Sequence, residues 1–96
     1  MNEGGRVDPE AMNRVEDTVR GVLRDVLALP DAQVDTFDAD TALFGALPEL
    51  DSMAVAGVLT ELEDRLGIVI EDDEVDGEML ETFGALTRFA AERVTA

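Results

Sequence analysis

Residues 50–67 read LDSMAVAGVLTELEDRLG, and this segment predicts a helix with a marked beginning and end. Asp51 and Ser52 are both residue types that cap helix N-termini, and Gly67 is the type that ends helices. Residues spaced by three or four positions predict the buried face, which comprises Met53, Ala56, Leu59, Leu62 and Leu66. Val55 and Val58 fall outside this stripe, so we expect both to be partly exposed and available to a partner.

A second predicted helix precedes this segment and a third follows it. The earlier helix has a cap-type residue at Asp8 and a proline at its first position, Pro9, and Pro30 ends it near Leu29. Its apolar stripe comprises Met12, Val15, Val19, Val22, Leu23, Val26 and Leu27. The last helix begins after Thr82, and its apolar face comprises Leu86, Phe89, Ala90 and Val94.

The segments between these helices are irregular. Residues 30–51 form a long connection whose expected anchors are Leu43, Phe44 and Leu47. Residues 68–70 are expected to be an extended segment whose isoleucines fill the core, and a short helical turn follows near Val75, Met79 and Leu80. The fold class is therefore all-α: a small four-helix bundle, with three main helices and one short helix, and a long loop between helices 1 and 2. We expect one domain over residues 8–96 after a flexible N-terminus, residues 1–7.

The composition excludes several classes of function. The 96 residues include 23 Asp and Glu against 7 Arg, which gives a formal net charge of −16, and there is no His or Cys. A His general base, a thiolate nucleophile and a zinc site of the usual type are therefore excluded. Nucleic acid is not an expected partner, because its phosphates repel so negative a surface. No secretory signal or membrane-spanning run is visible, so we expect a cytoplasmic protein without membrane contact. We also expect it to be a monomer.

The negative charge is concentrated in two blocks. Residues 30–51 hold six acids and no base, residues 61–81 hold ten acids against Arg65 alone, and residues 52–60 carry no charge. Such blocks are either solvated faces or docking surfaces for basic partners, and charge alone does not choose between them. Asp72, Glu74, Asp76 and Gly77 resemble the start of a calcium-binding loop. Phe83 stands where that loop needs a bidentate Glu, so we expect no metal site.

Four short motifs, in order and with matching spacing, resemble the acyl carrier protein family. They are DTALF at residues 40–44, LDSM at 50–53, LTELEDRLGIVI at 59–70 and TFGAL at 82–86. The resemblance covers about residues 19–94. It implies that a phosphopantetheinyl transferase attaches 4′-phosphopantetheine from coenzyme A to Ser52, with Asp51 as part of the attachment motif. Acyl groups would then be carried as thioesters on the thiol of that arm, and the chain would have no catalytic residues of its own.

The resemblance also implies partners. Besides the transferase, these would be acyl-activating ligases, acyltransferases or synthases with basic docking surfaces. The residues expected to dock are Met53, Val55, Val58, Glu61, Glu63 and Asp64. Leu50 replaces the glycine that is usual before the attachment motif, and Met53 replaces a leucine. Because the first turns after Ser52 are apolar where fatty-acid carriers are acidic, we expect a specialised, stand-alone carrier.

A different class of function is also compatible with the residues. In that alternative the chain is an acidic helical adaptor that binds a basic protein partner without any prosthetic group. Ser52 would then serve only as the N-cap of its helix.

Overall fold

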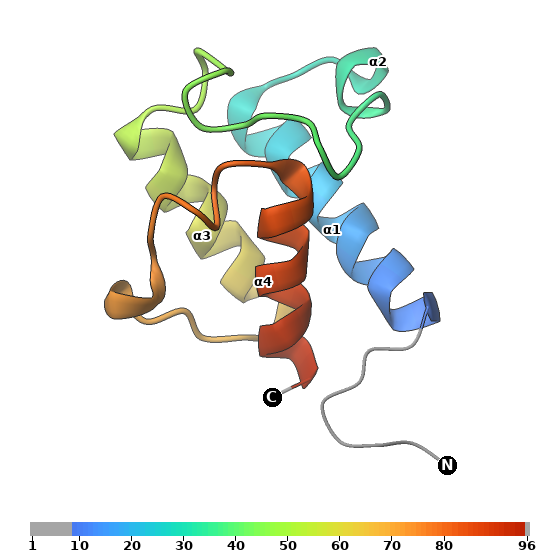
Figure 1. Ribbon diagram of the computed structural model, residues 1–96, viewed down its shortest axis with the longest axis vertical. Helices are drawn as coiled ribbons and strands as arrows, with labels where there is room; N and C mark the ends of the chain where they lie inside the picture. The colour runs from blue at the N-terminus through green and yellow to red at the C-terminus, as the bar shows by residue number, and fades with distance from the viewer. Residues whose placement is uncertain (1–8, 96) are drawn as a thin grey trace.

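The computed structural model describes residues 9–95, which form three long helices and two short ones (Figure 1). The described residues contain no β-strand, although Ala42 and Thr82 form an isolated bridge. The predicted all-α bundle with a long loop after the first helix is confirmed. The expected flexible N-terminus, residues 1–7, and the expected cap, Asp8, lie outside the described residues. The elements are α1 (Pro9–Leu27), α2 (Asp31–Val34), α3 (Ser52–Leu66), the 3-10 helix η1 (Asp72–Glu74) and α4 (Phe83–Thr95).

Helix α1 is the element against which α2, α3 and α4 all pack (Figure 1). It begins at Pro9 as predicted and ends at Leu27. Ala28 follows in the left-handed region with a φ of 56°, which ends the helix two residues before Pro30. Most of the predicted stripe is in the core, whereas Met12 and Val26 are only partly buried. The fully buried members are Val15, Val19, Val22, Leu23 and Leu27.

Helix α3 has the predicted bounds but not the predicted buried face. Val58 and Leu62 are fully buried, whereas Ala56 is exposed and Met53 is 85% exposed. The physical reason is that Met53 and Leu62 are nine residues apart, which is two and a half turns, so they lie on opposite sides of the helix. The expectation that Val58 is exposed was therefore wrong. Gly67 ends the helix as predicted, with a φ of 65° and its amide donating to the Glu63 carbonyl.

Helix α4 begins after Thr82 as predicted, and the Thr82 hydroxyl accepts a hydrogen bond from the Ala85 amide at 3.0 Å. Phe83, Leu86, Ala90 and Ala91 are buried, and Phe89 is partly buried. The predicted core residue Val94 is exposed, because it lies in the last turn at the end of the bundle (Figure 1).

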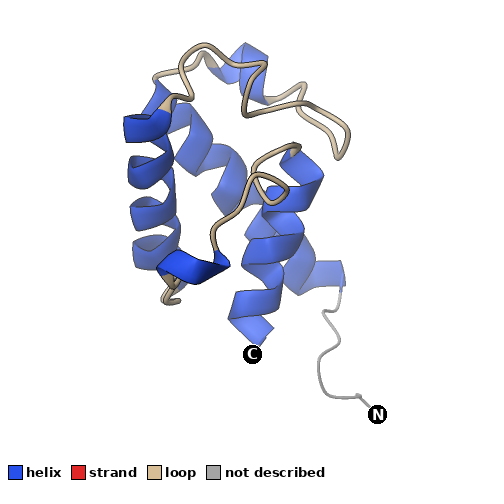
Figure 2. Ribbon diagram, turned by 60° about the vertical axis from the view of Figure 1, so that its left-hand side comes forward, coloured by secondary structure: helices blue, strands red, loops and turns tan. Residues whose placement is uncertain are grey.

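The long loop crosses one end of the bundle (Figure 2) and is fastened there by backbone bonds. Leu43 is fully buried as predicted, but Phe44 is 50% exposed and does not act as an anchor. Three buried residues of this region were not predicted as anchors: Val34, Phe37 and Leu50. Residues 39–44 also pair with residues 80–84 through the bonds Leu43 N–Glu81 O, Phe44 N–Leu80 O, Phe83 N–Thr41 O and Gly84 N–Ala39 O, which are 2.8 to 3.0 Å long.

Arg20 of α1 attaches the first part of this loop to the bundle. Its guanidinium donates to the carbonyls of Val34 and Phe37 and lies over the ring of Phe83, 4.8 Å from the centroid. The Phe37 and Phe83 rings are themselves 5.8 Å apart. The partly buried Arg20 guanidinium therefore joins α1 to α4 through a cation-π contact and to the loop through hydrogen bonds.

The segment between α3 and α4 only partly follows the prediction. Ile70 packs against the core, whereas Ile68 is half-buried and Val69 is 70% exposed. The short helix is η1, at residues 72–74, slightly earlier than expected. Met79 and Leu80 are buried after it in a turn.

Candidate functional site

The start of α3 separates the roles of two neighbouring residues. Asp51 is the N-cap, because its carboxylate accepts a hydrogen bond from the Ala54 amide at 2.9 Å. Ser52 is the first helical residue, it is exposed, and it is the only serine in the chain. The alternative in which Ser52 serves as the cap is therefore wrong. Its hydroxyl takes no part in the cap bond.

The backbone at this helix end favours an anion. The Ala54 amide is satisfied by Asp51, and the Val55 amide donates to the Asp51 carbonyl at 2.9 Å. Among the described residues, the amides of Ser52 and Met53 have no hydrogen-bond partner. Unpaired amides and the helix dipole together stabilise a phosphate placed at such a helix end. A phosphodiester on the Ser52 oxygen fits this arrangement.

Leu50 is a buried residue of the long loop and directly precedes the cap residue Asp51. It stands where acyl carrier proteins usually have glycine, and its side chain is buried. Its amide donates a hydrogen bond to the Leu47 carbonyl at 3.0 Å. This bond closes a turn that contains the exposed residues Pro48 and Glu49. An apolar residue just before an N-cap fixes the angle at which the chain enters a helix. Leu50 is thus a buried anchor of the loop two residues before Ser52.

The apolar docking candidates divide into an exposed and a buried group. Met53 is almost fully exposed next to Ser52, and Val55 is half-buried against the core. Val58 is fully buried and cannot contact a partner while the bundle is folded, so the prediction that it is a docking residue is wrong. Phe44, in the loop before the site, is an exposed aromatic residue that sequence reasoning had placed in the core. No periodic pattern could identify it, because it lies outside any helix.

The acidic docking candidates also differ from one another. Asp64 is exposed and has no ion pair among the described residues. Glu61 pairs with Arg65 at 2.9 Å, and the Glu63 carboxylate accepts a hydrogen bond from the Ile70 amide at 2.7 Å. Part of the negative charge on α3 is thus used within the fold.

The Arg65 pair extends into a network that joins α3 to α1. The Asp25 carboxylate accepts hydrogen bonds from Arg24 and Arg65, both at 2.9 Å. These two bonds lower the pKa of Asp25 below its ordinary value. The same bond from Arg65 to Asp25 is the main reason that the pKa of Arg65 is raised. The network links the surfaces of α3 and α1 beside their buried contact.

Two of the three acids of the calcium-like motif have structural roles. Asp76 accepts a hydrogen bond from the Met79 amide at 3.0 Å, and Glu74 pairs with Arg93 at 2.9 Å. Within the part of the chain that the structure describes, no group of three or more potential metal ligands comes together. The described helices are also too short or too polar to cross a membrane.

Comparison with known proteins agrees with this geometry. A family model described as "Phosphopantetheine attachment site" matches residues 17–90. The solution NMR structure of a holo acyl carrier protein from Nitrosomonas europaea is 38% identical in sequence, with a TM-score of 0.77 over 86% of this chain and 98% of that chain. A search of curated proteins gave no significant match. The resemblance to acyl carrier proteins is thus confirmed, and this chain belongs to the phosphopantetheine-attachment family, whose acyl carrier members are carriers and not catalysts.

Proposed function

We propose that Ser52 is the attachment site of 4′-phosphopantetheine and that the chain shuttles acyl groups between partner enzymes. The observation that carries this proposal is that Asp51 caps α3, which leaves an exposed, unique serine hydroxyl at the first position of the helix. The attached group supplies a flexible arm whose thiol binds acyl groups as thioesters. The chain's own residues hold the Ser52 oxygen at the surface and present the unpaired amides of Ser52 and Met53 to the phosphate.

Intact mass tests the attachment site. The chain is incubated with coenzyme A and a broad-specificity phosphopantetheinyl transferase, and its mass is compared with that of Ser52→Ala. We expect the phosphopantetheinyl mass gain in the wild type and none in the variant. Thr60→Ala is the matched control, since Thr60 is an exposed hydroxyl on the same helix, and it should keep the gain. A gain that survives Ser52→Ala would place the group elsewhere, and no gain in the wild type would contradict the proposal.

We propose that partners dock beside this site through Met53, Val55 and Asp64. Met53 and Asp64 are supported by their exposure, and Val55 by its position one turn after Ser52. Acyl-activating ligases, acyltransferases or synthases with basic docking surfaces would use the carboxylates for steering and the apolar residues for contact. Glu61 and Glu63 would add to the negative field while keeping their internal bonds. The apolar first turn of α3 supports a specialised, stand-alone carrier over one for ordinary fatty acid synthesis.

The rate of transfer of the prosthetic group tests this surface. Met53→Ala should lower the rate of loading by the transferase, whereas Val69→Ala, which removes a similarly exposed apolar residue after α3, should not. Docking should also weaken as the ionic strength rises past ~0.15 M, where the Debye length is about 8 Å. Equal effects of the two substitutions would mean that Met53 is not part of the docking surface. The cytoplasmic location and the monomeric state expected from the sequence stay predictions.

A further inference from the structure

The methionines are the side chains of this protein that a mild oxidant would attack first. The sequence has four methionines and no Cys, His, Trp or Tyr. Thiols and thioethers are the groups that peroxides oxidise, and without Cys only the thioethers are left. A thioether is oxidised reversibly to a sulfoxide, which turns a flexible apolar side chain into a polar one.

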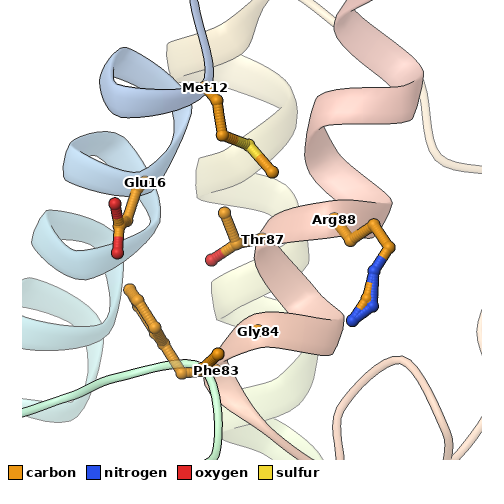
Figure 3. Close-up of a pocket in the computed structure, with 7 residues that line it drawn as sticks. Met12, Glu16, Phe83, Gly84, Thr87 and Arg88 are labelled. Atoms are coloured by element: carbon orange, nitrogen blue, oxygen red, sulfur yellow. The ribbon is translucent and has the colours of Figure 1, made fainter. Parts of the chain in front are cut away.

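The fold protects these methionines unequally. Met53 is 85% exposed at the second position of α3, whereas Met79 is 6% exposed in the core. Met12 is partly buried, and its side chain points from α1 toward α4 in a pocket of about 280 Å³ between these helices (Figure 3). Met1 lies outside the described residues. Because oxidation follows exposure, Met53 is the methionine among residues 9–95 that should react first.

Met53 also occupies the position where a change in polarity has the largest effect on the proposed site. It directly follows Ser52, and it is the most exposed large apolar residue of the described chain. Residues 52–60 carry no charge, so a partner that reaches Ser52 meets an apolar surface there. A polar oxygen placed within an apolar contact loses its water without gaining a hydrogen bond.

The charge of the chain favours a neutral oxidant. With a formal net charge of −16 the surface repels anionic oxidants, whereas hydrogen peroxide carries no charge. The Met53 sulfur would give an electron pair to one peroxide oxygen, so that a sulfur–oxygen bond forms and the oxygen–oxygen bond breaks. The other oxygen leaves as water with both hydrogens of the peroxide. The sulfur is oxidised as the peroxide is reduced.

We propose that Met53 is a reversible oxidation site that controls attachment of the arm to Ser52. Because loading is the step that Met53 would control, this role rests on the proposed attachment site. The sulfoxide would weaken the apolar contact with the transferase, and the fold would be unaffected because Met53 lies outside the core. A methionine sulfoxide reductase would restore the thioether by using a dithiol, which becomes a disulfide while the oxygen leaves as water.

Peptide mapping of the apo chain after treatment with hydrogen peroxide tests the site of oxidation. We expect Met53 to gain an oxygen atom before Met12 and Met79 do. The melting temperature of the chain oxidised at Met53 should match that of the untreated chain. Oxidation of Met12 or Met79 ahead of Met53, or a lower melting temperature, would overturn the proposal.

The rate of loading tests the consequence of oxidation. After catalase has removed the peroxide, the chain is incubated with coenzyme A and the transferase. We expect the oxidised chain to load at least about fivefold more slowly than the untreated chain, as for a polar group placed in an apolar contact. Prior treatment with dithiothreitol and the two methionine sulfoxide reductases, one for each sulfoxide epimer, should restore the rate.

The possible failures of this experiment are distinguishable. An unchanged loading rate, or a loss that the reductases do not reverse, would overturn the control by Met53 and leave attachment at Ser52 standing. An untreated chain that takes up no arm would contradict the attachment site, and the control by Met53 with it.

Two matched substitutions assign the effect to one sulfur atom. Met53→Leu keeps an apolar side chain of similar size without the sulfur, and Met12→Leu makes the same exchange in the pocket. The loading rate of each variant after peroxide is divided by the rate of its own untreated form, so differences in basal rate cancel. We expect peroxide to slow Met12→Leu but not Met53→Leu. Equal slowing of both variants would mean that another methionine is responsible.

Discussion

Helices α3 and α4 begin in the same way but in opposite surroundings. Each has a side-chain cap that accepts a bond from the third helical amide, Asp51 in α3 and Thr82 in α4. In α4 the first two amides, of Phe83 and Gly84, also donate to carbonyls of the long loop. In α3 the first two amides have no partner among the described residues, and Ser52 is exposed. The first amides of α4 therefore hold the long loop in place, whereas the first amides of α3 are unpaired beside an exposed serine.

Adding one methyl group should separate the loop from α4. In Gly84→Ala the new Cβ would lie 2.8 Å from the Ala39 carbonyl oxygen and 2.9 Å from its Cα, which are backbone atoms that cannot turn aside. We expect a loss of about 1–3 kcal/mol in the free energy of unfolding, measured by urea denaturation. Gly77→Ala is the control, because its Cβ would meet nothing within 4 Å. If both variants unfold at the same urea concentration, the close contact at the α4 start is unimportant.

Removing either cap should cost a similar amount but affect different regions. Asp51→Ala and Thr82→Ala should each lower the free energy of unfolding by about 0.5–2 kcal/mol. Hydrogen exchange should distinguish them. Thr82→Ala should loosen the amides of residues 39–44, which are bonded to the α4 start, while Asp51→Ala should loosen only the first turn of α3. Loosening of residues 39–44 in both variants would remove the contrast between the two helix ends.

The ion-pair network between α1 and α3 gives a smaller, pH-dependent effect. Because the pKa of Asp25 is lowered in the folded state, its contribution to stability is present above its ordinary pKa of about 4 and is lost as the pH falls through the lowered value. The melting temperature of Asp25→Asn should therefore lie below that of the wild type at neutral pH and approach it in acid. Asp17→Asn, at another exposed acid of α1, controls for the change in net charge. A gap that is constant down to pH 2 would contradict this role.

The smallest effect on stability should come from Ser52 itself. Since Asp51 supplies the cap, Ser52→Ala should change the free energy of unfolding by less than about 0.5 kcal/mol, as for other exposed positions. Thermal unfolding of the apo protein measures this. A loss as large as that of Asp51→Ala would mean that the serine also supports the helix.

The sequence predicted the helix limits better than it predicted which sides of the helices are buried. Pro9, Gly67 and Thr82 identify helix ends through local backbone chemistry, and all three are where they were expected. The first two turns of α3 are apolar on every side, so composition does not distinguish the face of Val58 from the face of Met53. Only the periodicity of 3.6 residues per turn distinguishes these two faces. The predicted face was built from repeated spacings of three, and such a stripe moves around the helix instead of staying on one side.

The loop was harder to predict because its attachments are mainly backbone to backbone. Pairing between residues 39–44 and 80–84 depends on carbonyl and amide groups that every residue has, so no side-chain pattern indicates it. The attachment by Arg20 is similar, since it binds the carbonyls of Val34 and Phe37. Ser52 was identified because its neighbours form a contiguous motif.

The division between Asp51 and Ser52 has a consequence for turnover in the cell. Because the cap that stabilises α3 is not the residue that would be modified, attachment of the arm should leave the cap in place. The added phosphate, held by the unpaired amides and the helix dipole, should make the folded state more stable. Proteases that degrade transiently unfolded chains would then degrade the unmodified form faster, so we expect the carrier to live longer once the arm is attached.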